Sequence, residues 1–134
     1  MTTVCFACVH NAGRSQMAAA FFGEIANPDR ARAVSAGTAP SDSINPVVAE
    51  VMAELGFDLK GAIPRRLTAE LAGQVDMLVT MGCGEQCPVV AGLTVIDWPL
   101  NDPKGKSVEA VRVVRDGVRA RVMAMVDEHG WRRA

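Results

Sequence analysis

The sequence predicts an α/β fold, a three-layer sandwich with a four-stranded parallel sheet between helices. Short apolar runs alternate with stretches whose apolar residues recur at helical spacing, the pattern of strand–helix–strand units. The chain has 134 residues, of which 49% are hydrophobic. This is enough to bury a core in one domain, which we take to be residues 1–134. Reactive side chains also follow three of the predicted strands.

The first quarter of the chain reads as strand, turn, helix and strand. Residues 3–7 form a β-branched and apolar run typical of a buried strand. The turn-rich stretch 9–13 separates this run from residues 15–25, where Ala and Met predominate without proline and predict a helix. An Asn-Pro-Asp sequence ends that helix. A second strand follows over residues 31–36 and ends at Gly37.

Two further helices are predicted in the middle of the chain. Asn45 and the proline after it suit the N-cap and N1 positions of a helix over residues 46–55. Gly56 suits the C-terminal cap of that helix. A short helix is expected over residues 67–71, opened by Thr68.

The remaining elements are two strands and a long helix. Residues 75–81 read as the third strand and lead into a cysteine-bearing loop over residues 82–88. The fourth strand is expected over residues 93–96, before a loop over residues 97–106 and a helix over residues 108–128. The apolar stripe of that helix comprises Val111, Val114, Val118, Val122, Met125 and Val126.

The overall charge and the N-terminal segment narrow the classes of function. A formal net charge of −1 does not indicate binding to nucleic acid or to an anionic membrane. No Lys or Arg precedes the first apolar run, and this run is too short for a signal peptide or a membrane span. We therefore expect a cytosolic protein. Its cysteines, Cys5, Cys8, Cys83 and Cys87, then favour catalysis, redox chemistry or metal binding over structural disulfides.

Three chemically important residues follow predicted strands. Cys8 follows the first strand, Cys83 the third and Asp102 the fourth. The carboxyl ends of parallel strands share one edge of a sheet, where ligands bind in open α/β folds. We therefore expect these three residues to converge on one site.

Cys8 begins a Cys-x5-Arg-Ser motif that predicts an oxyanion-binding loop. Such a loop can direct its backbone N–H groups inward, next to the positive N-terminus of the following helix. Arg14 can bind two oxygens of an anion, and the same positive features favour the thiolate form of Cys8. We expect Ser15 to donate a hydrogen bond to that thiolate and Asn11 to hold the shape of the loop. The predicted substrate-binding residues are Val9, His10, Asn11, Ala12, Gly13, Arg14 and Ser15.

Extended through residue 18, the loop reads CVHNAGRSQMA, and this resembles the arsenate reductases built on the low-molecular-weight protein tyrosine phosphatase fold. The resemblance covers nearly the whole chain. Further matching segments are residues 35–38, 79–83, 87–88, 97–98 and 102–106. The resemblance implies a four-stranded parallel sheet with helices on both faces. The phosphatase branch usually has proline where this chain has Gln16, and tyrosine where it has Lys104.

The resemblance implies a reaction that reduces arsenate to arsenite, as part of arsenic detoxification. Cys8 would attack arsenate and Asp102 would be the general acid for the departing water. Cys83 would then form a disulfide with Cys8, and Cys87 would move it to a Cys83–Cys87 disulfide, a redox-active pair reset by thioredoxin or a similar thiol reductant. No cofactor or metal is expected. Only three residues separate Cys83 from Cys87, against six in the thioredoxin-coupled members.

Several alternatives remain open at this stage. Some relatives transfer arsenic to mycothiol, with mycoredoxin, a glutaredoxin-like partner, completing the reduction. A phosphatase would use the same loop through a Cys8-phosphate intermediate, and phosphate or sulfate would mimic arsenate. A non-catalytic oxyanion sensor would only bind. Zinc could be held by Cys83 and Cys87 together with Cys5, Cys8, His10 or His129.

Overall fold

The computed structural model describes residues 1–59, 61–81, 92–100 and 102–133. The described helices and strands are, in chain order, β1 (Thr2–Cys8), α1 (Arg14–Ile25), β2 (Ala31–Gly37), α2 (Pro46–Ala53), α3 (Ala69–Ala72), β3 (Met77–Thr80), β4 (Thr94–Asp97) and α4 (Val108–His129). They alternate as the sequence predicts.

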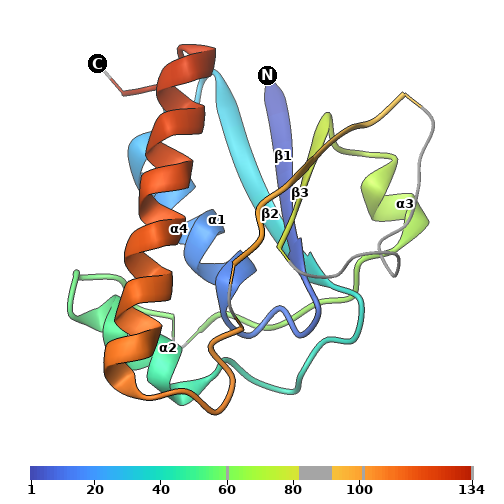
Figure 1. Cartoon of the computed structure of the whole chain (residues 1–134). Coiled ribbons are helices and arrows are strands. Elements are labelled where there is room, and N and C mark those ends of the chain that lie inside the picture. Colours follow the sequence, from blue (N-terminus) through green and yellow to red (C-terminus); the bar gives the residue numbers. More distant parts are fainter. Residues whose placement is uncertain (60, 82–91, 101, 134) are drawn as a thin grey trace.

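The four strands form one parallel sheet in the order β2-β1-β3-β4 (Figure 1). β1 lies inside the sheet and pairs along its whole length with β2, so that Cys8 lies opposite Gly37. Because all the strands run in the same direction, their carboxyl ends lie at one edge. The predicted fold class is confirmed.

The two faces of the sheet carry different cores. Val4, Phe6 and Cys8 belong to the large core, which α1, α2 and α4 cover. Cys5 and Ala7 alternate with them along β1 and belong to a smaller core on the other face, beside α3. The alternation of the strand thus places the thiols of Cys5 and Cys8 on opposite faces of the sheet.

The element boundaries differ from the predicted ones where turn geometry overrides the apolar pattern. α2 ends at Ala53 rather than at residue 55, and Leu55 is exposed. Gly56 does not cap the helix directly but turns the chain with φ 88°, a conformation that glycine adopts without a steric penalty. α1 begins at Arg14, one residue earlier than expected. The predicted loop over residues 82–88 lies outside the described residues.

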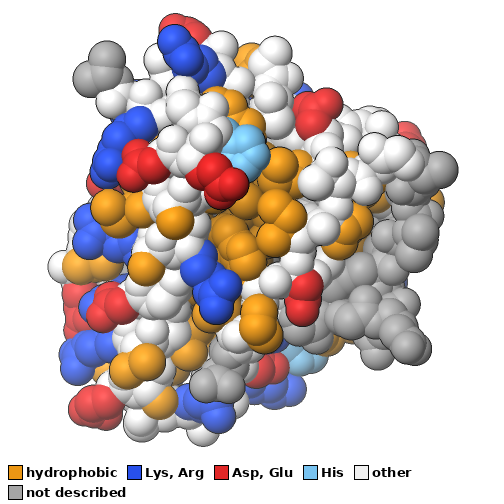
Figure 2. Space-filling model, turned by 45° about the horizontal axis from the view of Figure 1, so that its top comes forward, with side chains coloured by type: hydrophobic (Ala, Val, Ile, Leu, Met, Phe, Trp, Pro, Cys, Tyr) orange, Lys and Arg blue, Asp and Glu red, His pale blue; other side chains and the backbone are white. Residues whose placement is uncertain are grey.

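The face of the molecule in Figure 2 carries side chains of both charges. Figure 2 shows Lys and Arg side chains interspersed with Asp and Glu side chains, and hydrophobic side chains gathered near the centre of the view. In the described part of the chain, no helix is both long enough and apolar enough to cross a membrane. An attraction for anions must therefore come from a local arrangement of groups.

An ion-pair cluster joins α2 to α4. Glu54, at the C-terminal end of α2, accepts hydrogen bonds from Arg112 and Arg115 of α4 at 2.6 and 2.8 Å. Arg115 is largely buried and also donates to the carbonyl oxygen of Val51 at 2.9 Å. The cluster fixes α2 against the long helix, and the N-terminal end of α2 borders the site described below.

The charge of Glu54 should make stability depend on pH. Its hydrogen bond from Arg112, followed by the smaller effects of Arg115, holds the pKa of Glu54 below its usual value. The ionised form is therefore favoured by folding, and this contribution to stability is present above the unfolded-state pKa of about 4.3 and is lost as pH falls through the folded-state value. We expect Glu54→Gln to lower the melting temperature at pH 7, by an amount that shrinks below about pH 4.

Thermal unfolding followed by circular dichroism at pH 7 and pH 3.5 checks this prediction. Glu24→Gln, at an exposed residue of α1, is the control and should leave the melting temperature nearly unchanged. A difference between the wild type and Glu54→Gln that stays the same at both pH values would contradict the role of the ionised carboxylate.

Candidate active site

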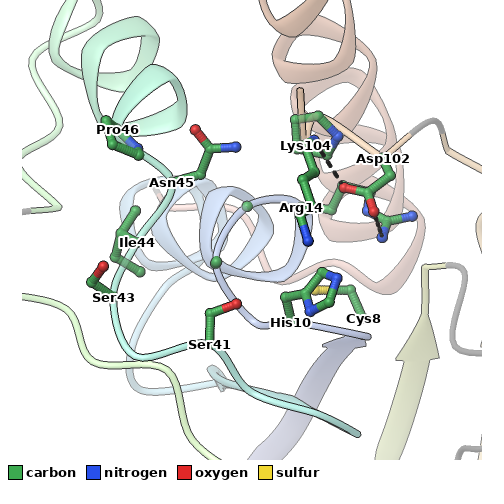
Figure 3. A pocket seen from close by; sticks show the side chains of 13 residues that line it. Cys8, His10, Arg14, Ser41, Ser43, Ile44, Asn45, Pro46, Asp102 and Lys104 are labelled. Carbon is green, nitrogen blue, oxygen red and sulfur yellow. Dashed lines mark hydrogen bonds and ion pairs between the residues drawn. The ribbon is translucent and has the colours of Figure 1, made fainter. Parts of the chain in front are cut away.

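A cavity of about 210 Å³ opens at the carboxyl edge of the sheet. The loop after β1 forms one part of its wall, and residues 41–46 and 102–104 form the rest (Figure 3). Cys8, Arg14 and Asp102 all line this cavity. The structure thus brings together three of the five residues for which the sequence predicts a catalytic role.

Backbone carbonyl oxygens at the end of β1 and in the loop after it accept hydrogen bonds from another segment. They accept hydrogen bonds from backbone N–H groups of the segment that follows β2, at distances of 2.8 to 3.2 Å. The pairs are Cys8 with Thr38, Val9 with Ala39, His10 with Ser41 and Ala12 with Asn45. This arrangement leaves the N–H groups of the loop for an anion, as in a backbone nest.

Asn11 holds the loop from inside. It is fully buried, and in the described part of the chain it is the one non-glycine residue with positive φ, at 49°. Its Nδ2 donates to Ser15 Oγ at 2.7 Å. Its Oδ1 accepts hydrogen bonds from Gln16 Nε2 at 3.1 Å and from the backbone N–H of Arg65 at 2.9 Å. The sequence predicts that Asn11 holds the shape of the loop, but it does not predict these two donors.

The thiol of Cys8 lies at the end of β1, and the residue is only 2% exposed. Its Sγ is 2.9 Å from Ser15 Oγ, the contact expected from the sequence. Ser15 is fully buried in the first turn of α1. Among the described residues, Ser15 is therefore the side-chain hydrogen-bond partner of Cys8, and Cys8 also lines the cavity.

Arg14 connects the loop to the segment that carries Asp102. Its Nη1 donates to the carbonyl oxygen of Leu100 at 3.1 Å, and its Nη2 lies 3.7 Å from Asp102 Oδ2. Arg14 is 5% exposed, and its Nε is the one buried side-chain nitrogen or oxygen without a hydrogen-bond partner among the described residues. The side chain of Asp102 is 45% exposed. A buried guanidinium with a free N–H group beside a cavity is suited to bind an anion.

Cys5 is placed for packing rather than for chemistry. Burial raises the pKa of its thiol to about 11, with a smaller opposing effect from Arg65.

His129 stacks on Trp131, with ring centroids 4.3 Å apart. Among the residues that the structure describes, no group of three or more His, Cys, Asp or Glu side chains is arranged to hold a metal ion. Cys83 and Cys87 lie outside the described residues.

Gly37, the last residue of β2, packs against the loop after β1, and only glycine fits at this position. A Cβ atom added at Gly37 would lie 2.6 Å from the carbonyl oxygen of Val9 and 2.9 Å from the backbone nitrogen of Asn11. Both neighbours are backbone atoms that are already hydrogen-bonded or buried, so displacing them would cost free energy. β2 and the oxyanion loop are therefore in direct contact.

We expect Gly37→Ala to displace the loop and to lower the free energy of unfolding by about 1–3 kcal/mol. The control is Gly23→Ala in α1, where an added Cβ meets nothing within 4 Å. That change should stabilise the protein by about 0.5–1 kcal/mol, since alanine is the better helix former. Urea denaturation gives both values. Equal changes in the free energy of unfolding for the two variants would contradict the close contact at Gly37.

The fold and the site define a class, α/β proteins with a Cys-x5-Arg loop at the carboxyl edge of a parallel sheet. The sequence profile of the family named low molecular weight phosphotyrosine protein phosphatase matches residues 3–130. The chain therefore belongs to this family.

Several relatives carry names that refer to arsenate. A putative arsenate reductase of Halobacterium salinarum is 39% identical over 127 residues, which are 92% of this chain and 89% of the relative. A glutaredoxin arsenate reductase of Synechocystis is 32% identical over 129 residues, 94% of this chain and 97% of the relative. The structure of a thioredoxin-dependent arsenate reductase from Corynebacterium glutamicum superposes with a TM-score of 0.82 at 33% identity. That match covers 96% of this chain, which spans 61% of the length of the other.

Proposed function

We propose that this protein is an arsenate reductase that converts arsenate to arsenite through a cysteine relay begun by Cys8. The observation that carries the proposal is that a buried thiol, a buried guanidinium and a half-exposed carboxyl group line the same cavity, those of Cys8, Arg14 and Asp102. The names of relatives that are 39% and 33% identical support arsenate as the substrate.

The proposed substrate site is the loop over residues 8–15. Arsenate, a tetrahedral dianion near neutral pH, would accept hydrogen bonds from the loop N–H groups and from Arg14. Arg14 Nε has no acceptor among the described residues, and a bound oxyanion would supply one. Binding would also compete with the contacts that Arg14 makes to Leu100 and Asp102.

In the first chemical step, the Cys8 thiolate would attack arsenic, form a sulfur–arsenic bond and expel one oxygen as water. Asp102 is the proposed general acid that protonates the departing oxygen. Its carboxyl group lines the cavity, and its Oδ1 accepts a hydrogen bond from the backbone N–H of Lys104 at 3.0 Å. That bond fixes the orientation of the carboxyl group at the mouth of the site.

In the second step, a Cys83 thiolate would attack Cys8 Sγ. The sulfur–arsenic bond would break and its electron pair would leave with arsenic, so that arsenate is reduced to arsenite while a Cys8–Cys83 disulfide forms. A Cys87 thiolate would then attack Cys83, release the Cys8 thiolate and leave a Cys83–Cys87 disulfide. Two electrons pass from the thiols to arsenic, and an external dithiol would restore them.

The proposed external reductant is a thioredoxin-type dithiol in the cytosol. One relative is named as thioredoxin-dependent and another as a glutaredoxin arsenate reductase, so the two names support a thiol donor but differ in its kind. Mycothiol with mycoredoxin is the alternative donor. Turnover measured separately with thioredoxin, with glutaredoxin and with mycothiol plus mycoredoxin distinguishes these three donors.

The test uses the fully reduced protein mixed with arsenate and no reductant. The proposal predicts about one arsenite per chain and a Cys83–Cys87 disulfide by peptide mapping. Cys8→Ser should release none. Four intact thiols and no arsenite, together with hydrolysis of a phosphomonoester that Cys83→Ser leaves unchanged, would instead establish the phosphatase. Oxyanion binding without turnover of either substrate would establish the sensor.

We expect Asp102→Asn to slow arsenite formation about 100-fold or more at pH 7, because general acid catalysis typically contributes this much. Rapid-quench measurement of arsenite in a single turnover gives the rate. The control is Asp29→Asn, at an exposed residue in the turn before β2. A rate for Asp102→Asn equal to that of the control would exclude Asp102 as the acid.

A further inference from the structure

We propose that Gln16 is a positioning residue for Cys8, acting through Asn11 and Ser15 to keep the hydroxyl proton of Ser15 directed at Cys8 Sγ. The inference rests on the proposed function in taking Cys8 as the nucleophile. It adds a residue that lies outside the Cys-x5-Arg-Ser motif and does not line the cavity.

Gln16 binds Asn11 at two points. It lies in the first turn of α1 and is 8% exposed. Its Nε2 is 3.1 Å from the main-chain oxygen of Asn11 and 3.1 Å from Asn11 Oδ1. A side-chain amide nitrogen carries two hydrogens, one for each acceptor. Gln16 thus holds both the backbone and the side chain of the one residue whose left-handed conformation turns the loop.

Two backbone groups fix which way each amide points. The main-chain oxygen of Asn11 can only accept, so Gln16 must present its NH2 group to it. The backbone N–H of Arg65 can only donate, so Asn11 must present Oδ1 to it and direct Nδ2 at Ser15. Neither amide can flip without breaking a bond to the backbone.

The orientation of the amides decides the direction of the last hydrogen bond. Ser15 Oγ accepts from Asn11 Nδ2 at 2.7 Å, so its single proton is free to be donated to Cys8 Sγ at 2.9 Å. A donated hydrogen bond stabilises a thiolate more than a neutral thiol. The order of donation is therefore Gln16 to Asn11, Asn11 to Ser15, and Ser15 to Cys8.

Loss of Gln16 should reduce the reactivity of Cys8 more than it unfolds the protein. Arg65 and Ser15 would still bind Asn11, so the loop keeps two of its side-chain anchors. Gln16→Met preserves the length of the side chain and removes both donors. The matched control is Gln74→Met, at an exposed glutamine outside the site.

The readout is the rate at which iodoacetamide alkylates Cys8, measured by peptide mass spectrometry. The background carries Cys83→Ser and Cys87→Ser, which leaves Cys8 and the fully buried Cys5. At pH 7 we expect Gln16→Met to slow alkylation about three- to tenfold, the effect of one net hydrogen bond or slightly more. At pH 9.5, above the ordinary pKa of about 8.5 for a cysteine thiol, the rates should converge.

Among the residues that the structure describes, the titratable groups that line the cavity around Cys8 are His10 and Arg14 from the loop and Asp102 and Lys104 from the opposite wall. All four are the same in both variants, so a difference between the variants belongs to Gln16. Equal rates for Gln16→Met and Gln74→Met at pH 7 would overturn the proposal. An equal decrease in the alkylation rate at both pH values would also overturn the proposal, because it would indicate a general loosening of the loop and not an effect on the thiolate.

A second measurement separates this proposal from the proposed function. In single turnover with arsenate, Gln16→Met should lower the rate constant by the same factor, with little change in the half-saturating arsenate concentration. Protein that fails to reduce arsenate but shows the predicted alkylation difference would refute arsenate reduction and leave the role of Gln16 standing. If the protein reduces arsenate but Gln16→Met leaves the alkylation rate unchanged, arsenate reduction would stand and the role of Gln16 would be refuted.

Discussion

The left-handed backbone at Asn11 is the constraint on which the site depends. The chain leaves β1 at Cys8 and enters α1 at Arg14, so it must reverse within residues 9–13. A left-handed conformation costs most L-residues free energy, and asparagine tolerates it better than others. Hydrogen bonds on both sides of its amide hold Asn11 in place. The placement of the thiol against the start of α1 follows from this turn.

The walls of the cavity are mechanically connected. A Cβ atom at Gly13 would lie 2.7 Å from Pro103 Cγ, so the backbone of the loop after β1 packs directly against the Pro103 side chain, next to Asp102. Arg14 adds a hydrogen bond to Leu100 and an ion pair with Asp102. The cation that would bind substrate thus also holds the acidic segment in place. Occupancy of the proposed oxyanion site would therefore be energetically coupled to the position of Asp102.

Periodicity and spacing were sufficient to predict the fold and the loop. The stripe of α4 from Val111 to Val126 is buried, and Asn45 and Thr68 cap their helices as expected. The apolar pattern predicted an end of α2 at residue 55 because Leu55 continues the pattern. In the structure the chain leaves the helix earlier and turns at Gly56. The hydrogen-bond donors that hold the loop could not be predicted from periodicity or spacing. The donors are the backbone N–H groups of Thr38, Ala39, Ser41, Asn45 and Arg65, which any residue but proline would supply.

The aromatic composition gives the molecule a simple optical spectrum. The chain has no tyrosine and two tryptophans, so its near-ultraviolet emission comes from Trp98 and Trp131 alone. Trp98 is buried against Phe6, with ring centroids 5.7 Å apart, two residues before the carbonyl group that binds Arg14. Trp131 stacks on an imidazole ring near the opposite edge of the sheet. Each chromophore thus senses a different end of the protein, and one of them lies directly beside the segment that a bound anion would disturb.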